Sequence, residues 1–366
     1  MNSTRRIAWA APILIYAASA LEMIIMVTPF AAYFYSVYTP LFHGLEQNAL
    51  TAWLPQFFLP HLAHTRWPFF RALSLVGAAL TLIGLLGFLA CAIQLYYGKF
   101  VKKRLVSGGL YGRVRHPQYL CLVIAGAGLL LLWPRFFILI TYLMMLGLYY
   151  VLARHEEEAI RARYGAPADA YLASVPMFNP FGRRQPSARF APPSRGKAFM
   201  AWVGICVVAL GLAFGLRALA LTQLYLVRIA TPPVTALSFR VRSAEHINGI
   251  MRNVLNNQSV REHVLRRPGE SLFMQITAGR GQLKHLLIDL GIVSAAIEAL
   301  PLPEQGEFVV LSRVHSRNGA GPPPADPFAF SSQIEPLFLA MPDAGGMAVI
   351  ALDPAQFHPG FVRIRF

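Results

Sequence analysis

A short run of residues suited to anion binding and proton transfer lies in the middle of an apolar chain. Arg115, His116 and Pro117 are consecutive, and Glu156 and Glu157 follow one long apolar stretch later. Proline suits the first position of a helix, and the positive end of such a helix, with the two basic side chains, could bind a carboxylate or phosphate. The glutamates could accept hydrogen bonds from an amine or a ribose hydroxyl. We call residues 115–117 and the pair Glu156 and Glu157 the two corners of this site. A ligand with both charges, such as S-adenosylmethionine, would bind to both corners.

A simpler interpretation is that the basic residues only anchor the chain to lipid phosphates. Arg113 and Arg115 could do so while the glutamate run balances their charge. Taken one residue at a time, this interpretation is favoured. Charged groups at the edge of a bilayer are costly and often functional, however, so the combination of motifs favours a binding site.

Composition predicts an α-helical integral membrane protein with a small C-terminal α+β domain. The chain has 366 residues, of which 55% are hydrophobic. Residues 1–230 carry 21 Lys and Arg against 6 acidic residues, whereas residues 231–366 carry 12 against 11. The basic residues lie beside apolar stretches, which indicates membrane topology and lipid headgroups and not a nucleic-acid partner.

Apolar stretches of sufficient length predict about five membrane helices. They are residues 7–38, residues 69–97, the two arms of a helical hairpin over residues 118–153, and residues 198–227. The hairpin turns at Trp133, Pro134 and Arg135, and it should bring its two polar ends together. Residues 40–68 read as an interfacial loop, and a cleaved signal peptide is the alternative for the first apolar stretch.

The predicted domain organisation follows these stretches. N-terminal membrane helices and the interfacial loop occupy residues 1–98, a core with the hairpin 99–182, a linker 183–197, an additional membrane helix 198–229, and an extramembrane domain 230–366. In that domain we expect a helix over residues 244–265 and strands over residues 271–277, 308–314, 347–352 and 361–366.

Basic residues beside the spans predict the orientation. Both ends of the hairpin should face the cytoplasm. The domain after residue 230 would then lie outside, in the periplasm if the membrane is the inner membrane of a bacterium. It could meet an extracytoplasmic partner there.

A longer series of motifs surrounds the two corners. It comprises Leu105-Val106, Gly109, Tyr111, Val114-Arg115-His116-Pro117, Tyr119, Glu156-Glu157, Ile160, Tyr164-Gly165, Tyr171, Val175-Pro176, Phe178 and Pro180. This ordered series resembles the isoprenylcysteine carboxyl methyltransferase family and its phospholipid methyltransferase relatives. Four residues depart from the family pattern, namely Leu110, Cys121, Ala168 and Met177. They leave the methyl acceptor open.

The resemblance implies S-adenosylmethionine as cofactor and a lipophilic acceptor: an isoprenylcysteine-like carboxylate, a phospholipid amine or a thiol. His116 and Tyr119 would hold the methionine moiety, and Glu156 or Glu157 would help to fix the cofactor. The implied cofactor-binding set also includes Tyr111, Arg113 and Pro117. Arg115, Arg113 or Arg154 would provide positive charge near the acceptor, and no metal is implied. For an amine or thiol acceptor, Glu157 or His116 is a candidate base.

Two other functions remain open. Related membrane reductases, which reduce isoprenoid or sterol double bonds with NADPH, use a similar helical core, but the sequence has no clear dinucleotide fingerprint. The chain could also be a non-enzymatic anchor that presents residues 231–366 to a partner.

Overall fold

The computed structural model describes residues 17, 20, 21, 34–98, 106–181, 195–316, 326–343 and 346–357. The chain forms two compact units. The helical unit comprises residues 1–31, 73–133 and 138–212, and the sheet unit comprises residues 32–72, 134–137 and 213–366. The sheet unit therefore includes the residues of the expected interfacial loop as well as the C-terminal domain.

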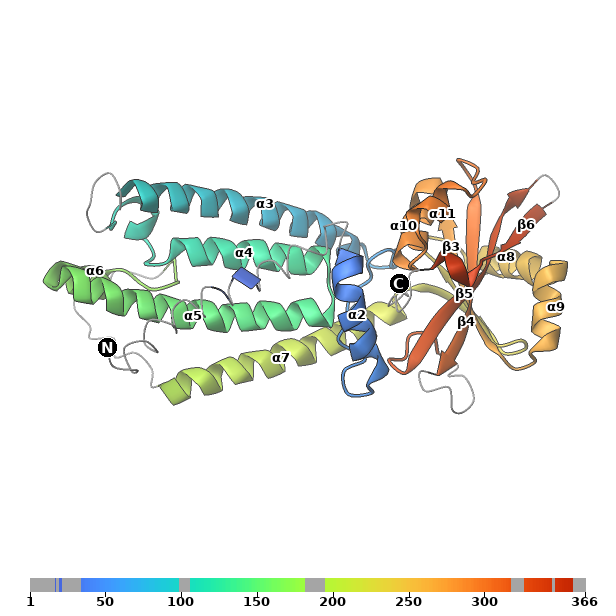
Figure 1. Cartoon of the computed structure of the whole chain (residues 1–366), viewed down its shortest axis with the longest axis horizontal. Coiled ribbons are helices and arrows are strands. Elements are labelled where there is room, and N and C mark those ends of the chain that lie inside the picture. Colours follow the sequence, from blue (N-terminus) through green and yellow to red (C-terminus); the bar gives the residue numbers. More distant parts are fainter. Residues whose placement is uncertain are drawn as a thin grey trace. The chain divides into compact units, whose positions relative to one another are not determined.

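Long apolar helices dominate the part of the chain before residue 223 (Figure 1). They are α3 (Pro68–Tyr96), α4 (Pro117–Leu132), α5 (Phe136–Tyr164) and α7 (Arg195–Thr222), with the short α6 (Ala166–Ser174) after α5. Among the described residues, three helices are long and apolar enough to cross a membrane: α3, α5 and, over Gly196–Thr222, α7. Only 17% of the most apolar window of α3 and 6% of that of α7 is buried in protein, so these helices are suited to contact lipid.

The predicted number of about five spans is not reached in the described part of the chain. The first expected span, residues 7–38, lies mostly outside it. The helix α4 has 16 residues, short for an upright crossing. The expected linker also lies mostly outside the described residues.

The helices α4 and α5 form the predicted hairpin, with its turn at residues 133–135. The Tyr142 hydroxyl of α5 donates to the Val123 carbonyl of α4 at 3.1 Å. The helix α5 is longer than predicted: it runs to Tyr164, whereas the second arm of the hairpin was expected to end at residue 153. Leu152 and Ala153 are buried in the helical unit, and this packing stabilises the helix beyond residue 153. It stops before Gly165, whose φ of +59° favours glycine.

Small residues let α3 and α4 approach until their backbones touch. A Cβ atom on Gly84 would lie 2.6 Å from the Cys121 carbonyl oxygen, and one on Gly77 would lie 2.9 Å from the Gly128 carbonyl oxygen. Real Cβ atoms do not come so close to backbone atoms. The two helices can therefore keep this spacing only with glycine at these positions.

Replacing Gly84 by alanine is expected to push α3 away from α4 and to lower the free energy of unfolding by about 1–3 kcal/mol, as overpacking does. Thermal unfolding of the full chain in detergent would measure the change. Gly211→Ala is the control, because no atom lies within 4 Å of its added Cβ. Equal stability of both variants would contradict the close packing.

The sheet unit contains one six-stranded sheet (Figure 1). Its strands, in spatial and chain order, are β1 (Tyr225–Ile229), β2 (Val234–Ser238), β3 (Ser271–Ala278), β4 (Glu307–Ser316), β5 (Ser332–Asp343) and β6 (Gly346–Ala351). The pair β2 and β3 is parallel, and the other neighbours are antiparallel. Buried residues of α8 (Ala244–Asn256) and α9 (Gln258–Arg266) pack on one face of the sheet. On the other side lie α10 (Arg280–Asp289) and α11 (Ser294–Glu298).

The α+β prediction for this domain is confirmed, but several elements differ from those expected. The helix expected over residues 244–265 is broken at Asn257, which caps α9. The helix α7, expected as an additional membrane span to residue 227, ends at Thr222, because residues from Tyr225 pair with β2 as strand β1. Part of the expected interfacial loop is helical, as α2 (Phe34–Gln47). The strand expected over residues 361–366 lies outside the described residues.

Within the sheet unit, the rest of the loop pairs with the hairpin turn. The Phe58 N–H donates to the Pro134 carbonyl at 2.9 Å, and the Phe137 N–H donates to the Leu54 carbonyl at 2.8 Å. Buried Arg135 donates to the Pro55 carbonyl at 2.6 Å. A segment that reads as an irregular loop is therefore held by backbone pairing.

Candidate functional site

The motif around His116 is held at the start of α4. His116 is the residue before the helix, and Pro117 is the first residue within it. The preceding 3-10 turn, η3 (Gly109–Gly112), begins at a φ of +58° and is fixed by Gln94 of α3, which donates to the Gly108 carbonyl at 2.5 Å. The corner is thus fixed by α3 as well as by α4.

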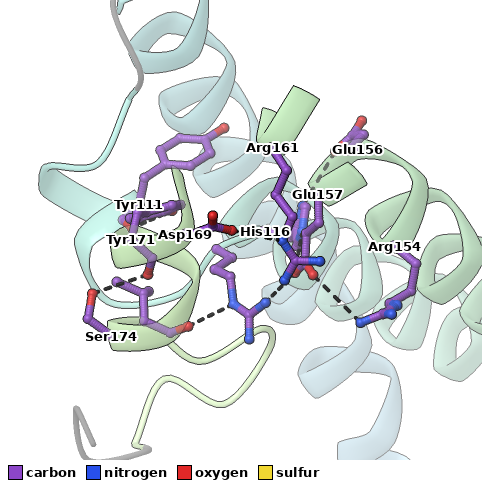
Figure 2. Close-up of polar contacts among 11 residues, drawn as sticks. Tyr111, His116, Arg154, Glu156, Glu157, Arg161, Asp169, Tyr171 and Ser174 are labelled. Atoms are coloured by element: carbon purple, nitrogen blue, oxygen red, sulfur yellow. Dashed lines mark hydrogen bonds and ion pairs between the residues drawn. The ribbon is translucent and has the colours of Figure 1, made fainter. Parts of the chain in front are cut away.

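The structure brings the two predicted corners together (Figure 2). Nη1 of Arg115 lies 2.6 Å from Oε1 of Glu157. The His116 ring lies between two carboxylates, with Nδ1 3.4 Å from Oε2 of Glu156 and Nε2 3.4 Å from Oε1 of Glu157. Residues about forty positions apart in the chain therefore form one compact charged cluster.

Aromatic side chains support the carboxylate of Glu156. The Tyr119 hydroxyl donates to Oε1 of Glu156 at 2.7 Å. The Tyr119 ring stacks on His116 at 5.6 Å and on Tyr149 at 5.0 Å between centroids. Glu156 is therefore oriented by a hydroxyl and an imidazole, while 26% of its side chain stays exposed to a ligand.

Three further residues were predicted to belong to the site, and they differ in how close they lie to the charged cluster. Nη1 of Arg154 lies 3.8 Å from Oε2 of Glu157, with the side chain 31% exposed. Arg113 is exposed. Tyr111 is buried, with its hydroxyl 3.5 Å from the Cys91 carbonyl, so this hydroxyl points to α3. Of the predicted residues, Arg154 joins the cluster directly, whereas Tyr111 contributes to packing.

Burial and charge act in opposite directions on His116. Burial alone lowers the pKa of this imidazole, but the nearby carboxylates of Glu156 and Glu157 raise it above its ordinary value. The His116 side chain is only 3% exposed. The charged imidazolium is thus the form that this surrounding favours.

Several polar atoms of the cluster are buried without an ordinary hydrogen bond to the described residues. They are Nδ1 and Nε2 of His116, Oε1 of Gln118 and Oε2 of Glu157. Buried polar atoms usually find a partner in the protein, in water or in a ligand. The His116 nitrogens lie 3.4 Å from glutamate oxygens and Oε2 of Glu157 lies 3.8 Å from Arg154, so these contacts are long and a water or polar ligand would complete the hydrogen bonding.

The charge on His116 predicts a pH dependence of stability. Its folded pKa is raised, so its stabilising contribution is full below the unfolded pKa of about 6.5 and is lost as the pH rises through the folded value. Thermal unfolding in detergent should show this loss for the wild type and a smaller one for His116→Gln. Identical pH profiles would contradict the assigned charge.

The sequence alone assigned no role to Tyr149 or Gln118. Tyr149 is 3% exposed and supports the Tyr119 ring from α5. A signal was available, since Tyr149 precedes Glu156 by two helical turns and so shares its face. Gln118 stands inside the motif, but burial of its oxygen could not be predicted from its position.

Comparison with known proteins identifies the segment that carries the cluster's two main corners. No curated protein and no solved structure matches the chain. Residues 72–167, which run from α3 to the start of α6, match the model of the phospholipid methyltransferase family. This matched segment contains Arg115, His116, Glu156 and Glu157, and over it the resemblance predicted from the motifs is confirmed.

Proposed function

We propose that the protein is a membrane methyltransferase that transfers the methyl group of S-adenosylmethionine to a lipophilic acceptor. The observation that supports this most is the buried His116 between the carboxylates of Glu156 and Glu157, at the start of a helix. The match to a family of phospholipid methyltransferases supports the same reaction class. The apolar helices beside the site suit an acceptor that arrives from a bilayer.

The residues present fit the charges of S-adenosylmethionine. The positive end of α4 would receive its carboxylate, and Glu156 would receive its ammonium group or a ribose hydroxyl. Pro117 has no N–H to donate, so the N–H groups that follow it would supply the contacts, and the His116 imidazolium, whose two nitrogens face Glu156 and Glu157, would add positive charge beside them. Tyr119 keeps the Glu156 carboxylate in place.

When bound, S-adenosylmethionine supplies an electrophilic methyl group, which forms a bond to the acceptor as its bond to sulfur breaks and sulfur keeps the electron pair. The chain contributes position and a low-dielectric surrounding. The latter favours transfer to a carboxylate or thiolate, because the charges of the sulfonium and of the acceptor cancel. For an amine acceptor, the proton released would pass to a carboxylate. Glu156 suits this step better than Glu157, because Glu157 is 1% exposed and engaged by Arg115.

An experiment would identify which of the three acceptor classes, a phospholipid amine, an isoprenylcysteine-like carboxylate or a thiol, receives the methyl group. Full-length protein in vesicles would be incubated with methyl-tritiated S-adenosylmethionine and one acceptor at a time: phosphatidylethanolamine, a farnesylated cysteine or an alkyl thiol. We expect label in an organic-soluble product of one class, and loss of that label in Glu156→Gln. No labelled product from these three or from a total bacterial lipid extract would reject the proposed reaction.

The reductase alternative gains no support from the family match, and titration with NADPH would test it. The orientation of the chain, with a cytoplasmic site and a periplasmic C-terminal domain, stays a prediction, as do the domain boundaries.

A further inference from the structure

Residues 175–178, which follow α6, lie along the start of α4. The backbone N–H of Arg115 donates to the Pro176 carbonyl at 2.9 Å, and that of His116 points to the Met177 carbonyl at 3.4 Å. Nε of Arg115 donates to the Val175 carbonyl at 2.7 Å. Two neighbouring residues of the motif therefore bind a segment sixty residues later by three separate contacts.

The side chains of this segment cover the imidazole. The Phe178 ring lies 5.9 Å from the His116 ring between centroids, on a tilt of 43°. Met177 and Phe178 pack on the buried cluster that contains Tyr119 and Tyr149. His116 is thus flanked by Tyr119 and by Phe178, and its side chain is 3% exposed.

Arg115 is the residue that joins this segment to α5. Its guanidinium donates through Nε to residue 175 and through Nη1 to Glu157 at 2.6 Å, and its side chain is 17% exposed. Such a two-sided fork is particular to arginine, because a lysine ammonium cannot serve both partners in fixed directions. An arginine committed to two protein partners is poorly placed to contact the acceptor.

We propose that Arg115 is a positioning residue, and that through it residues 175–178 form the wall that encloses the ligand over His116. This inference rests on the proposed function for the identity of the ligand. It changes the role expected for Arg115 from the resemblance, which was a charge near the acceptor. It also makes Glu157 the anchor of Arg115 and leaves Glu156 as the carboxylate that faces the ligand.

The test combines amide exchange with ligand binding in the full-length protein in detergent. In Arg115→Lys, exchange of peptides that cover residues 115–120 and 175–181 should rise by about tenfold or more, the effect of losing a charged hydrogen bond. The dissociation constant for S-adenosylhomocysteine should rise by a similar factor. Arg163→Lys, at an exposed position of α5, is the matched control and should change neither.

A kinetic readout separates positioning from direct contact. With saturating S-adenosylmethionine, Arg115→Lys should keep kcat within about threefold of the wild type, and the loss should appear in KM for this donor. Unchanged exchange over residues 175–181, or a fall of about a hundredfold in kcat with unchanged KM, would overturn the proposal.

A second variant keeps the test decisive if Arg115→Lys does not fold. Phe178→Leu removes the ring beside His116 and leaves the three contacts of Arg115 in place, so it should weaken S-adenosylhomocysteine binding by about tenfold with little change in exchange. Unchanged affinity of Phe178→Leu for S-adenosylhomocysteine would contradict the proposal that residues 175–178 enclose the ligand. If the wild type does not bind S-adenosylhomocysteine, the proposed function fails, and the exchange experiment still reports whether Arg115 holds the segment.

Discussion

Replacing His116 by alanine is expected to weaken binding of S-adenosylmethionine by about a hundredfold or more, roughly 3 kcal/mol. The variant removes the positive charge of the imidazolium, which would attract the ligand carboxylate at the start of α4 and holds Glu156 in place. It also leaves Glu156 and Glu157 facing each other without the ring that now separates them. Equilibrium dialysis with radiolabelled S-adenosylmethionine and the full-length protein in detergent would measure the change.

The chain offers a matched control for this prediction. His155 lies in the same helix as the two glutamates and is exposed, so His155→Ala should bind like the wild type. Melting curves of both variants would establish that each is folded. Binding by His116→Ala within about threefold of the wild type would show that the imidazole does not hold the ligand.

The second large effect is expected on stability, from Arg217 of α7. This arginine is 4% exposed, and it donates to the carbonyls of Phe57 and Phe328, the latter at 2.7 Å. Its guanidinium also lies 4.8 Å from the centre of the Phe330 ring. Arg217→Met leaves two buried carbonyls without this donor, so the free energy of unfolding should fall by about 3 kcal/mol.

Arg228→Met is the control for this change in the same unit. Arg228 pairs with Asp326 at 3.4 Å, and both side chains are about half exposed. Exposed pairs contribute little, so its effect should stay below about 1 kcal/mol. Unfolding in mixed micelles, followed by tryptophan fluorescence, would compare the two. Equal losses of stability in Arg217→Met and Arg228→Met would contradict the stabilising role of the buried Arg217.

The meeting of the two corners could be predicted because it depends on helix lengths alone. A turn at Pro134 makes two antiparallel arms, and arms of similar length return the chain to the level of His116. The detailed roles could not be predicted in the same way. Which glutamate Arg115 binds depends on the rotation of α5 about its own axis. The contact of Arg115 with Val175 joins residues sixty positions apart in the chain.

The sheet was only partly predictable, for reasons that particular residues show. The strand β5 contains Pro336 and Pro342, and proline normally argues against a strand. The sheet accommodates Pro336 next to a register shift between Leu311 and Ser312 of β4. The strand β1 was hidden for another reason: apolar residues continue from α7 into it, so composition does not mark the change of structure.

The proposed function requires that the corner at His116 and the pair Glu156 and Glu157 hold one ligand. Ultraviolet crosslinking of radiolabelled S-adenosylmethionine to the full-length protein, followed by peptide mapping, would show whether they do. We predict label in the peptides that cover residues 114–135 and 155–161, and its loss with excess S-adenosylhomocysteine. Competed label found only in residues 225–357, or no competed label at all, would contradict the account.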